Sequence, residues 1–241
     1  IHTMVRTRDI LWIGTVGGLV RFDIRSRTFR RFRISNSDYR LNHVTALERL
    51  SDDRLLVGTR YNGLLQYSIS KETFLPVALG GGEYSDGYVR SIYKDIDGLF
   101  WLGFDYQGLL AFRYNKGTCA LLEHEKRLEG IDCKRIAVFL QSRDKSFWVG
   151  SNGNGLFRFD PAAGRYTAYR HAHQDPRSIS QNSILSIFED RSGNIWIGTY
   201  AGGINRIIRD QKRFEVIKNQ PGNRNSLSNS TVFSVYEDSN E

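Results

Sequence analysis

A tryptophan recurs along this chain at nearly constant intervals, within short segments that are similar to one another. The last segment is IWIGTYAGGINR from Ile195, and its four relatives begin at Leu11, Leu55, Phe100 and Phe147. The anchor positions of the five segments are Trp12, Leu56, Trp101, Trp148 and Trp196, which lie 44, 45, 47 and 48 residues apart. Self-similarity at such a period is the signature of a repeat architecture. We therefore interpret these segments first as scaffold.

Each period contains four segments with the character of β-strands. Before the anchor, two apolar positions lie three residues apart, at Val44 and Leu47, Val89 and Ile92, Ile136 and Phe139, and Ile184 and Ile187. Turn residues such as Asp95, Asp97, Glu189, Asp190, Glu237 and Asp238 follow them and predict a hairpin. After the anchor strand come a third strand and an outer strand with the apolar pairs Phe29 and Phe32, Phe74 and Val77, Cys119 and Leu122, Tyr166 and Tyr169, and Phe214 and Ile217.

Four short strands in a period of about 45 residues, with a Trp and Gly signature, are typical of a β-propeller blade. We predict an all-β, single propeller domain over 1–241, built of four-stranded antiparallel blades and forming part of a larger propeller. The repeats cover approximately 1–34, 41–79, 86–124, 133–171 and 181–219, and a further repeat starts at 229–241. An alternative is a closed ring of five blades in which the strand around Val232 completes the first blade. A sandwich would leave the fixed period unexplained.

The recurring tryptophans are expected between blades, because a buried indole removes about 150–250 Å² from water. The glycine two residues after each anchor is expected where the neighbouring blade approaches too closely for a Cβ. These structural positions are Gly14, Gly58, Gly103, Gly150 and Gly198.

Composition narrows the function classes. With 40% hydrophobic and 25% charged residues among 241, the chain is typical of a globular domain, and it contains no apolar run of about 20 residues. No signal peptide is visible at Ile1, and the anchor after Val232 would lie past Glu241, so we expect a longer gene product. Whether Cys119 and Cys133 form a disulfide is left open by the sequence.

The net charge of +8 is concentrated in one basic cluster: Arg21, Arg25, Arg27, Arg30, Arg31 and Arg33. Such a cluster could contact an anionic ligand, a nucleic acid or a phospholipid surface. A solvated outer face is the favoured interpretation. No nucleic-acid-binding module accompanies the arginines, so we expect no nucleic-acid partner for this segment.

The repeat resembles the two-component regulator propeller repeat, found in the extracytoplasmic sensor regions of hybrid histidine kinases of the Bacteroides type. The similarity is good in NSLSNSTVFSVYEDSNE from Asn225 and in RSISQNSILSIFEDRSGNIWIGTYAGGINRI from Arg177, and all five anchors take part. The repeat around Leu56 departs from the pattern because it lacks the Trp, and the repeat around Trp148 has RDKS in its turn.

The resemblance implies a periplasmic, non-catalytic sensor segment without a cofactor. In that family the propeller recognises an oligosaccharide and signals across the membrane to control transcription, through rearrangement of a homodimer. Membrane contact and the kinase belong to other segments of such a protein. The resemblance carries over no binding residues, because family members bind different glycans. The basic balance of this chain favours an acidic glycan.

A binding site is expected in the loops between the second and third strands of each blade, since rigid scaffolds present function on loops. These loops supply Arg60, Tyr61, Asp105, Tyr106, Asn152, Asn154 and Tyr200. Aromatic faces can stack on sugars, amides and charges can bind hydroxyl groups, and Arg can bind a uronate or sulfate. Alternatively, these residues are present for the backbone conformation of a turn, which for Asn152 and Asn154 is equally plausible.

No catalytic constellation or metal site is predicted. A glycosidase needs two carboxylates flanking a sugar, whereas the acidic residues here recur in the hairpin turns, where repetition indicates a structural role. His171 and His173 could face one side of a strand, but no third metal ligand is signalled. The alternatives that stay open are a non-catalytic protein- or peptide-binding scaffold and, with less support, a glycan hydrolase or lyase.

Overall fold

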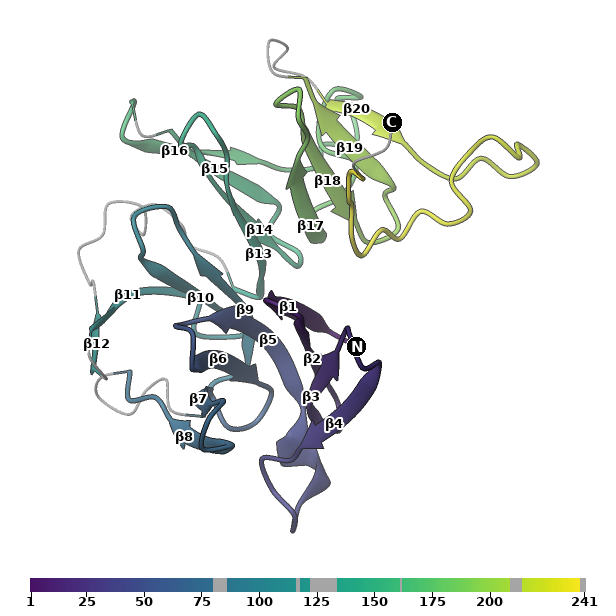
Figure 1. The fold of residues 1–241 in the computed structure, drawn as a ribbon. Helices are drawn as coiled ribbons and strands as arrows, with labels where there is room; N and C mark the ends of the chain where they lie inside the picture. The colour runs from purple at the N-terminus through teal and green to yellow at the C-terminus, as the bar shows by residue number, and fades with distance from the viewer. Residues whose placement is uncertain (80–85, 116–117, 122–133, 161, 209–213, 239–241) are drawn as a thin grey trace. The chain divides into compact units, whose positions relative to one another are not determined.

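A computed structural model describes residues 1–79, 86–115, 118–121, 134–160, 162–208 and 214–238 (Figure 1). Within these ranges the only helix is a 3-10 turn, η1 (Tyr39–Asn42), so the part described holds no helix with the length and apolarity of a membrane span. The strands are β1 (Thr3–Thr7), β2 (Ile10–Thr15), β3 (Gly18–Asp23), β4 (Thr28–Phe32), β5 (Val44–Arg49), β6 (Arg54–Thr59), β7 (Leu64–Ser68), β8 (Thr73–Pro76), β9 (Val89–Lys94), β10 (Phe100–Phe104), β11 (Leu109–Asn115), β12 (Thr118–Leu121), β13 (Ile136–Gln141), β14 (Phe147–Ser151), β15 (Leu156–Asp160), β16 (Arg165–Tyr169), β17 (Ile184–Glu189), β18 (Ile195–Thr199), β19 (Ile204–Ile207) and β20 (Phe214–Ile217). The chain divides into two compact units, Ile1–Glu123 and His124–Glu241.

Every four consecutive strands form one antiparallel sheet, in the order in which they follow along the chain. We call these sheets blades 1 to 5; blades 1, 2 and 3 belong to the first unit, and blades 4 and 5 to the second. The predicted all-β fold of four-stranded antiparallel blades is confirmed. Blade 1 contains its own first strand, since β1 pairs with β2 from Thr3 opposite Gly14 to Thr7 opposite Ile10. The alternative in which the strand around Val232 completes blade 1 is therefore wrong.

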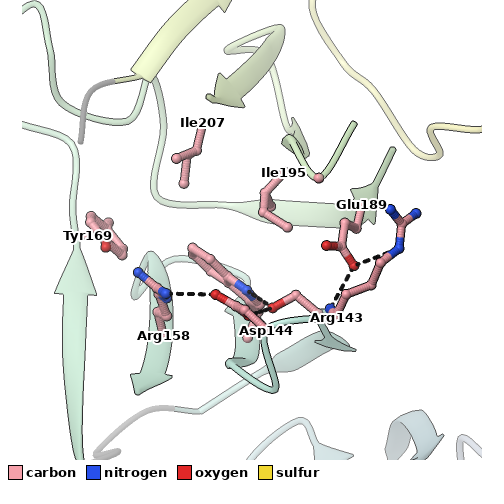
Figure 2. Close-up of a pocket in the computed structure, with 10 residues that line it drawn as sticks. Arg143, Asp144, Arg158, Tyr169, Glu189, Ile195 and Ile207 are labelled. Atoms are coloured by element: carbon pink, nitrogen blue, oxygen red, sulfur yellow. Dashed lines mark hydrogen bonds and ion pairs between the residues drawn. The ribbon is translucent and has the colours of Figure 1, made fainter. Parts of the chain in front are cut away.

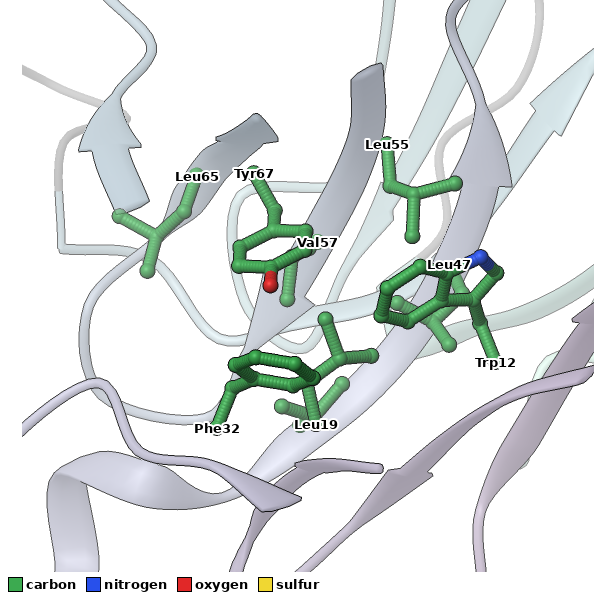
Figure 3. Packing of buried hydrophobic residues seen from close by; sticks show 9 residues of the cluster. Trp12, Leu19, Phe32, Leu47, Leu55, Val57, Leu65 and Tyr67 are labelled. Atoms are coloured by element: carbon green, nitrogen blue, oxygen red, sulfur yellow. The ribbon is translucent and has the colours of Figure 1, made fainter. Parts of the chain in front are cut away.

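Trp12 fills the space between blades 1 and 2 (Figure 3). It is 1% exposed and packs with Leu19 and Phe32 of its own blade and with Leu55 and Tyr67 of blade 2. The indole meets the Tyr67 ring edge-on, with 5.5 Å between the ring centroids. Burial of an indole stabilises the fold by about 4–6 kcal/mol at about 25 cal/mol per Å². Trp12 therefore lies between two blades, where the recurring tryptophans are expected.

The same position faces the next blade elsewhere in each unit. Leu56 of blade 2 belongs to a buried cluster with Val89 and Leu102 of blade 3. Trp148 of blade 4 belongs to a cluster with Ile184 and Ile197 of blade 5. Leucine therefore replaces tryptophan at this position without a change in its packing role.

The anchor-strand glycines lie where the next blade touches the sheet. A Cβ added to Gly58 would lie 2.7 Å from Val89 Cγ1, and one added to Gly150 would lie 2.7 Å from Ile184 Cγ2. The corresponding distances are 2.8 Å for Gly14 to Val44 and 2.9 Å for Gly198 to Val232. Real Cβ atoms do not approach this closely, so Gly14, Gly58 and Gly150 have no room for a side chain beside the next blade, and Gly198 has none beside Val232. Gly103 occupies the same register in β10.

Trp196 differs from the other anchors because it is only partly buried. In the part of the chain that the structure describes, no four-stranded sheet follows blade 5. The face of β18 that bears Trp196 is therefore less covered than the corresponding faces of β2 and β14. Residues 230–238 lie against it without forming a strand, and Val232 N donates to Thr199 O at 2.9 Å. These are the contacts that the first strand of a following blade makes, and the further repeat at 229–241 stays a prediction.

In each blade with a tryptophan anchor, the hairpin between the first two strands provides an acceptor for the indole. The bonds from Trp Nε1 are to Thr7 Oγ1 (2.9 Å), Asp95 Oδ2 (2.9 Å), Ser142 Oγ (3.1 Å) and Asp190 Oδ2 (2.7 Å). A buried indole N–H needs such a partner. In blade 2, where Leu56 replaces the donor, Leu50 occupies the position of the acceptor. The donor and its acceptor are therefore absent together.

Candidate functional site

Each blade has two ends, and the loops that follow the second strands all emerge at one of them. We call this the loop end and the opposite one, which carries the hairpin turns, the turn end. At the loop end, the residue after the second strand donates its N–H to the carbonyl of the residue before the first strand. These bonds join Arg60 to His43 (3.0 Å), Asp105 to Tyr88 (3.0 Å), Asn152 to Arg135 (2.9 Å) and Tyr200 to Ser183 (3.0 Å). The loops are thus fixed to the strand framework.

Arg60 is the central residue of the loop end of blades 2 and 3. Its Cζ lies 5.4 Å from the ring centroid of Tyr61 and 5.6 Å from that of Tyr88. The side chain is exposed, and among the described residues it has no carboxylate partner. Cation–π contacts hold a guanidinium in place without neutralising its charge. Arg60 therefore presents an open positive charge beside two aromatic rings.

Arg90 contacts the same Tyr88 ring, with its Cζ 5.3 Å from the centroid, but its charge is neutralised. Arg90 Nη1 donates to Asp105 Oδ1 at 2.6 Å, and Asp105 is buried. Asp105 is therefore a structural partner of Arg90 and offers little to a ligand. Tyr106, the next residue, is 65% exposed and available for stacking.

His2 and His43 form an imidazole pair at the same end of blades 1 and 2. Their Nε2 atoms are 3.0 Å apart and their ring centroids 4.7 Å apart. Loss of hydration on burial lowers the pKa of both imidazoles. The positive charge of Arg60 lowers the pKa of His2 further, and His2 and Arg60 do the same for His43. Burial and neighbouring positive charge thus disfavour protonation of either ring, and the two rings share one hydrogen bond.

In the second unit the predicted site residues lie on the loops of blades 4 and 5. Tyr200 is 58% exposed, Asn154 is exposed and Asn152 is partly buried. Within the described residues, neither asparagine amide has a hydrogen-bond partner. The positive φ angles of this turn belong to Gly153 (115°) and Gly155 (92°), so neither asparagine is required for the backbone conformation. Both amides remain open to a ligand.

The turn end has different chemistry. Asp190 accepts from the Trp196 indole, from Asn194 N (2.8 Å) and from the Asn194 side chain (2.8 Å). Burial acts to raise the pKa of Asp190, but these hydrogen bonds outweigh burial and lower it. Asp95 accepts from Trp101 and from the backbone N–H groups of Asp97 and Leu99. These carboxylates have structural roles, as their repetition indicates.

A cavity of about 110 Å³ lies at the turn end between blades 4 and 5 (Figure 2). Its apolar wall includes Trp148, and its charged groups are bound to one another. Arg158 pairs with Asp144 at 3.0 Å, and the Arg143 backbone N–H donates to Glu189 at 2.9 Å. A cavity of about 400 Å³ occupies the same position between blades 1 and 2. Recurrence and paired charges indicate a feature of the blade junction rather than a receptor.

The remaining candidate groups have local structural partners. The His171 imidazole bonds to Ile179 O through Nδ1 at 2.9 Å. No group of three or more His, Cys, Asp or Glu side chains in the described ranges could hold a metal ion. Cys119 is a free thiol whose pKa is raised to about 11 by burial, and Cys133 lies outside the described residues.

The basic cluster is partly neutralised. Arg21 pairs with Asp23 at 3.4 Å and Arg25 with Asp9 at 2.7 Å, and Arg30 binds both oxygens of Glu72 at 2.5 Å. The others, Arg27, Arg31 and Arg33, are exposed and have no carboxylate partner among the described residues. A solvated outer face agrees with this arrangement.

The candidate residues Arg60, Tyr61 and Tyr106 lie on loops, and the structure adds His2, His43, Tyr88 and Arg90, which the sequence analysis did not single out. Tyr88 and His43 directly precede the first strands, and no motif marks them because the residue type there changes from blade to blade. Their register was the available signal, since the residue before the first strand lies beside the loop after the second.

Comparisons with known proteins agree with this architecture. Residues 178–201 match the family described as the two component regulator propeller. The extracellular domain of the candidate hybrid two component system BT3049 from B. thetaiotaomicron has a TM-score of 0.74 at 20% identity, over 98% of this chain and 30% of that chain. The corresponding domain of BT4673 has a TM-score of 0.68 at 24% identity, over 89% of this chain and 28% of that one.

A third solved structure is PorZ, a surface component of the type-IX secretion system of Porphyromonas gingivalis, with a TM-score of 0.67 at 14% identity over 99% of this chain and 38% of that chain. No curated protein sequence matches the chain. The chain thus spans about a third of the length of the solved proteins, and at these identities the likeness establishes the fold. The chain is an all-β protein of four-stranded propeller blades, and its residues 178–201 match the two component regulator propeller family.

Proposed function

We propose that this chain is the ligand-sensing part of an extracytoplasmic propeller in a hybrid two-component sensor histidine kinase. In this proposal it is periplasmic and non-catalytic, binds an oligosaccharide at the loop end, and signals through a homodimer to control transcription. The repeat match at 178–201 and the likeness to extracellular domains of hybrid two-component systems support the sensor role.

The observation that carries the ligand proposal is an unneutralised guanidinium beside an exposed tyrosine, with a second exposed tyrosine on the corresponding loop of the next blade. Tyr61 is 45% exposed and Tyr106 is 65% exposed, on loops fixed by backbone hydrogen bonds to the strands, and Arg60 lies beside Tyr61. Rigid aromatic rings with few rotatable bonds bind at low entropic cost. This chemistry suits the apolar faces and hydroxyl groups of a sugar.

A protein- or peptide-binding scaffold is the second candidate. PorZ, a surface component of a secretion system, has the same fold and is described without a sensor role. The full coding sequence separates the two, because a sensor gene should encode a membrane span and a kinase as well as the propeller. A hydrolase or lyase has less support, because the carboxylates of Asp95 and Asp190 at the turn end are committed to hydrogen bonds.

A glycan array probed with the complete extracytoplasmic region tests the ligand class. The glycan it identifies should then bind this chain in calorimetry, and the double variant Tyr61→Ala/Tyr106→Ala should lose that binding without a change in melting temperature. Tyr236→Ala is the matched control, because Tyr236 is 83% exposed and lies in residues 230–238, outside these loops.

Unchanged affinity of the double variant would move the glycan site away from these loops. Absence of any glycan on the array, together with capture of a peptide, would replace the sensor proposal with the scaffold.

A further inference from the structure

The loop end of blades 1 and 2 combines a free guanidinium with two imidazoles that share one hydrogen bond. His43 O accepts from Arg60 N at 3.0 Å, so the guanidinium and the imidazole pair start from adjacent, hydrogen-bonded backbone positions. The Nε2 atoms of His2 and His43 are 3.0 Å apart, so one ring donates and the other accepts. A ring that gains a proton loses its acceptor site and gains a donor.

The two arginines of this region offer an internal contrast. Arg90 and Arg60 both contact the Tyr88 ring, but Asp105 neutralises only Arg90. Arg60 is therefore held in place by aromatic rings. Among the described residues, no carboxylate or carbonyl oxygen accepts a hydrogen bond from its five N–H donors. A planar guanidinium in this state matches the two oxygens of a carboxylate or sulfate.

We propose that Arg60 and the His2–His43 pair form an anion-binding subsite that takes the carboxylate or sulfate group of an acidic sugar, and that a proton binds to the imidazole pair together with the anion. The inference rests on the proposed function, because it assigns the charged part of the glycan within the loop-end site. The subsite is an electrostatic receptor whose affinity depends on pH.

The sign of the pH dependence follows from the charges that face the imidazoles. In the free protein Arg60 faces the pair, Tyr61 and Tyr88 line Arg60, and burial adds to the effect of the guanidinium; both disfavour an added proton. An anion on Arg60 cancels this repulsion, and so it raises the pKa of the pair. Linkage then requires that binding strengthens as pH falls through the bound-state pKa.

Binding of D-glucuronate, inorganic sulfate and D-glucose to this chain, measured by NMR of the imidazole nitrogens between pH 5 and 8, tests the inference. Glucuronate should move the titration of His2 and His43 to higher pH, and its affinity should rise roughly fivefold to tenfold between pH 7.5 and 5.5. Glucose should leave the titration unchanged. If sulfate shifts the imidazole titration as much as glucuronate does, the site binds anions and the sugar ring contributes nothing. That result would overturn the assignment to an acidic sugar.

Two variants separate the parts of the subsite. Arg60→Gln should abolish the glucuronate effect, and the double variant His2→Gln/His43→Gln should retain weaker binding that no longer depends on pH. Arg33→Gln is the charge-matched control, since Arg33 is exposed and has no carboxylate partner among the described residues. A glucuronate effect that persists in Arg60→Gln, or is lost equally in Arg33→Gln, would overturn the subsite.

The outcome also distinguishes this inference from the proposed function. Glycan-array binding confined to neutral oligosaccharides, with no imidazole response to glucuronate, rejects the anion subsite and leaves the sensor intact. An imidazole response to glucuronate without any oligosaccharide on the array keeps the subsite and rejects the proposed glycan ligand.

Discussion

The two ends of the blades are built from the same strands but satisfy their polar groups in opposite ways. At the turn end, Asp190 accepts hydrogen bonds from the Trp196 indole and the Asn194 amide, and Arg143 bonds to the carbonyls of the next turn. At the loop end, Arg60 has no anionic partner among the described residues, and Tyr200 is more than half exposed.

This difference separates scaffold from receptor. A charged group that already has its partners adds rigidity and has little to offer a ligand, whereas a group held by its backbone and aromatic neighbours keeps its own hydrogen bonds available. The cavities at the turn end are therefore less informative about function than the open loop end. Variants matched in residue type can test this division in the same protein.

The largest expected effect comes from truncating one aromatic ring at each end of the second unit. Trp148→Ala should lower the free energy of unfolding by about 3–5 kcal/mol, because it leaves a cavity between blades 4 and 5. Tyr200→Ala should change it by less than about 0.5 kcal/mol, because the ring is exposed. Urea denaturation followed by circular dichroism measures both. A comparable loss in the two variants would end the distinction between the ends.

A turn carboxylate should have the next largest effect. Asp190→Ala removes the acceptor of the Trp196 indole and of two Asn194 donors, and should cost about 2–3 kcal/mol of unfolding free energy. Asp190→Asn keeps one acceptor oxygen and should lose clearly less in the same denaturation experiment. Equal losses would mean that the hydrogen bonds at this turn are unimportant.

The acid dependence of stability should come from the turn end. Although burial opposes the shift, hydrogen bonds lower the pKa of Asp190 and Asp144 in the folded state. Their contribution is therefore present above the pKa of the unfolded chain and is lost as pH falls through the folded-state pKa. Melting temperatures between pH 6 and 3 should fall less steeply in Asp190→Asn than in the parent chain. Parallel curves would assign acid sensitivity to other groups.

The period predicted the blades well because the contacts that define it recur at fixed positions. Trp148 packs against blade 5, and Gly150 lies where blade 5 leaves no room for a side chain. These two contacts require an indole and a glycine at fixed positions, so they are visible in the sequence. The candidate site was only partly predictable, because a receptor depends on which side chains remain unpaired. Asp105 and Arg60 occupy equivalent loop positions, and only the contact of Asp105 with Arg90 distinguishes a structural residue from a binding one.

The smallest expected effect on stability concerns one arginine at each end. Arg143 donates to the carbonyl oxygens of Asp190 and Arg191 at 2.9 and 2.8 Å, so Arg143→Gln should cost about 0.5–1 kcal/mol. Arg60 has cation–π contacts but no such bonds, so Arg60→Gln should stay within about 0.5 kcal/mol of the parent chain and act on binding alone. Denaturation and glucuronate titration of both variants give a two-by-two comparison. The opposite pattern, with Arg60→Gln destabilising and Arg143→Gln weakening binding, would move the receptor from the loop end to the turn end.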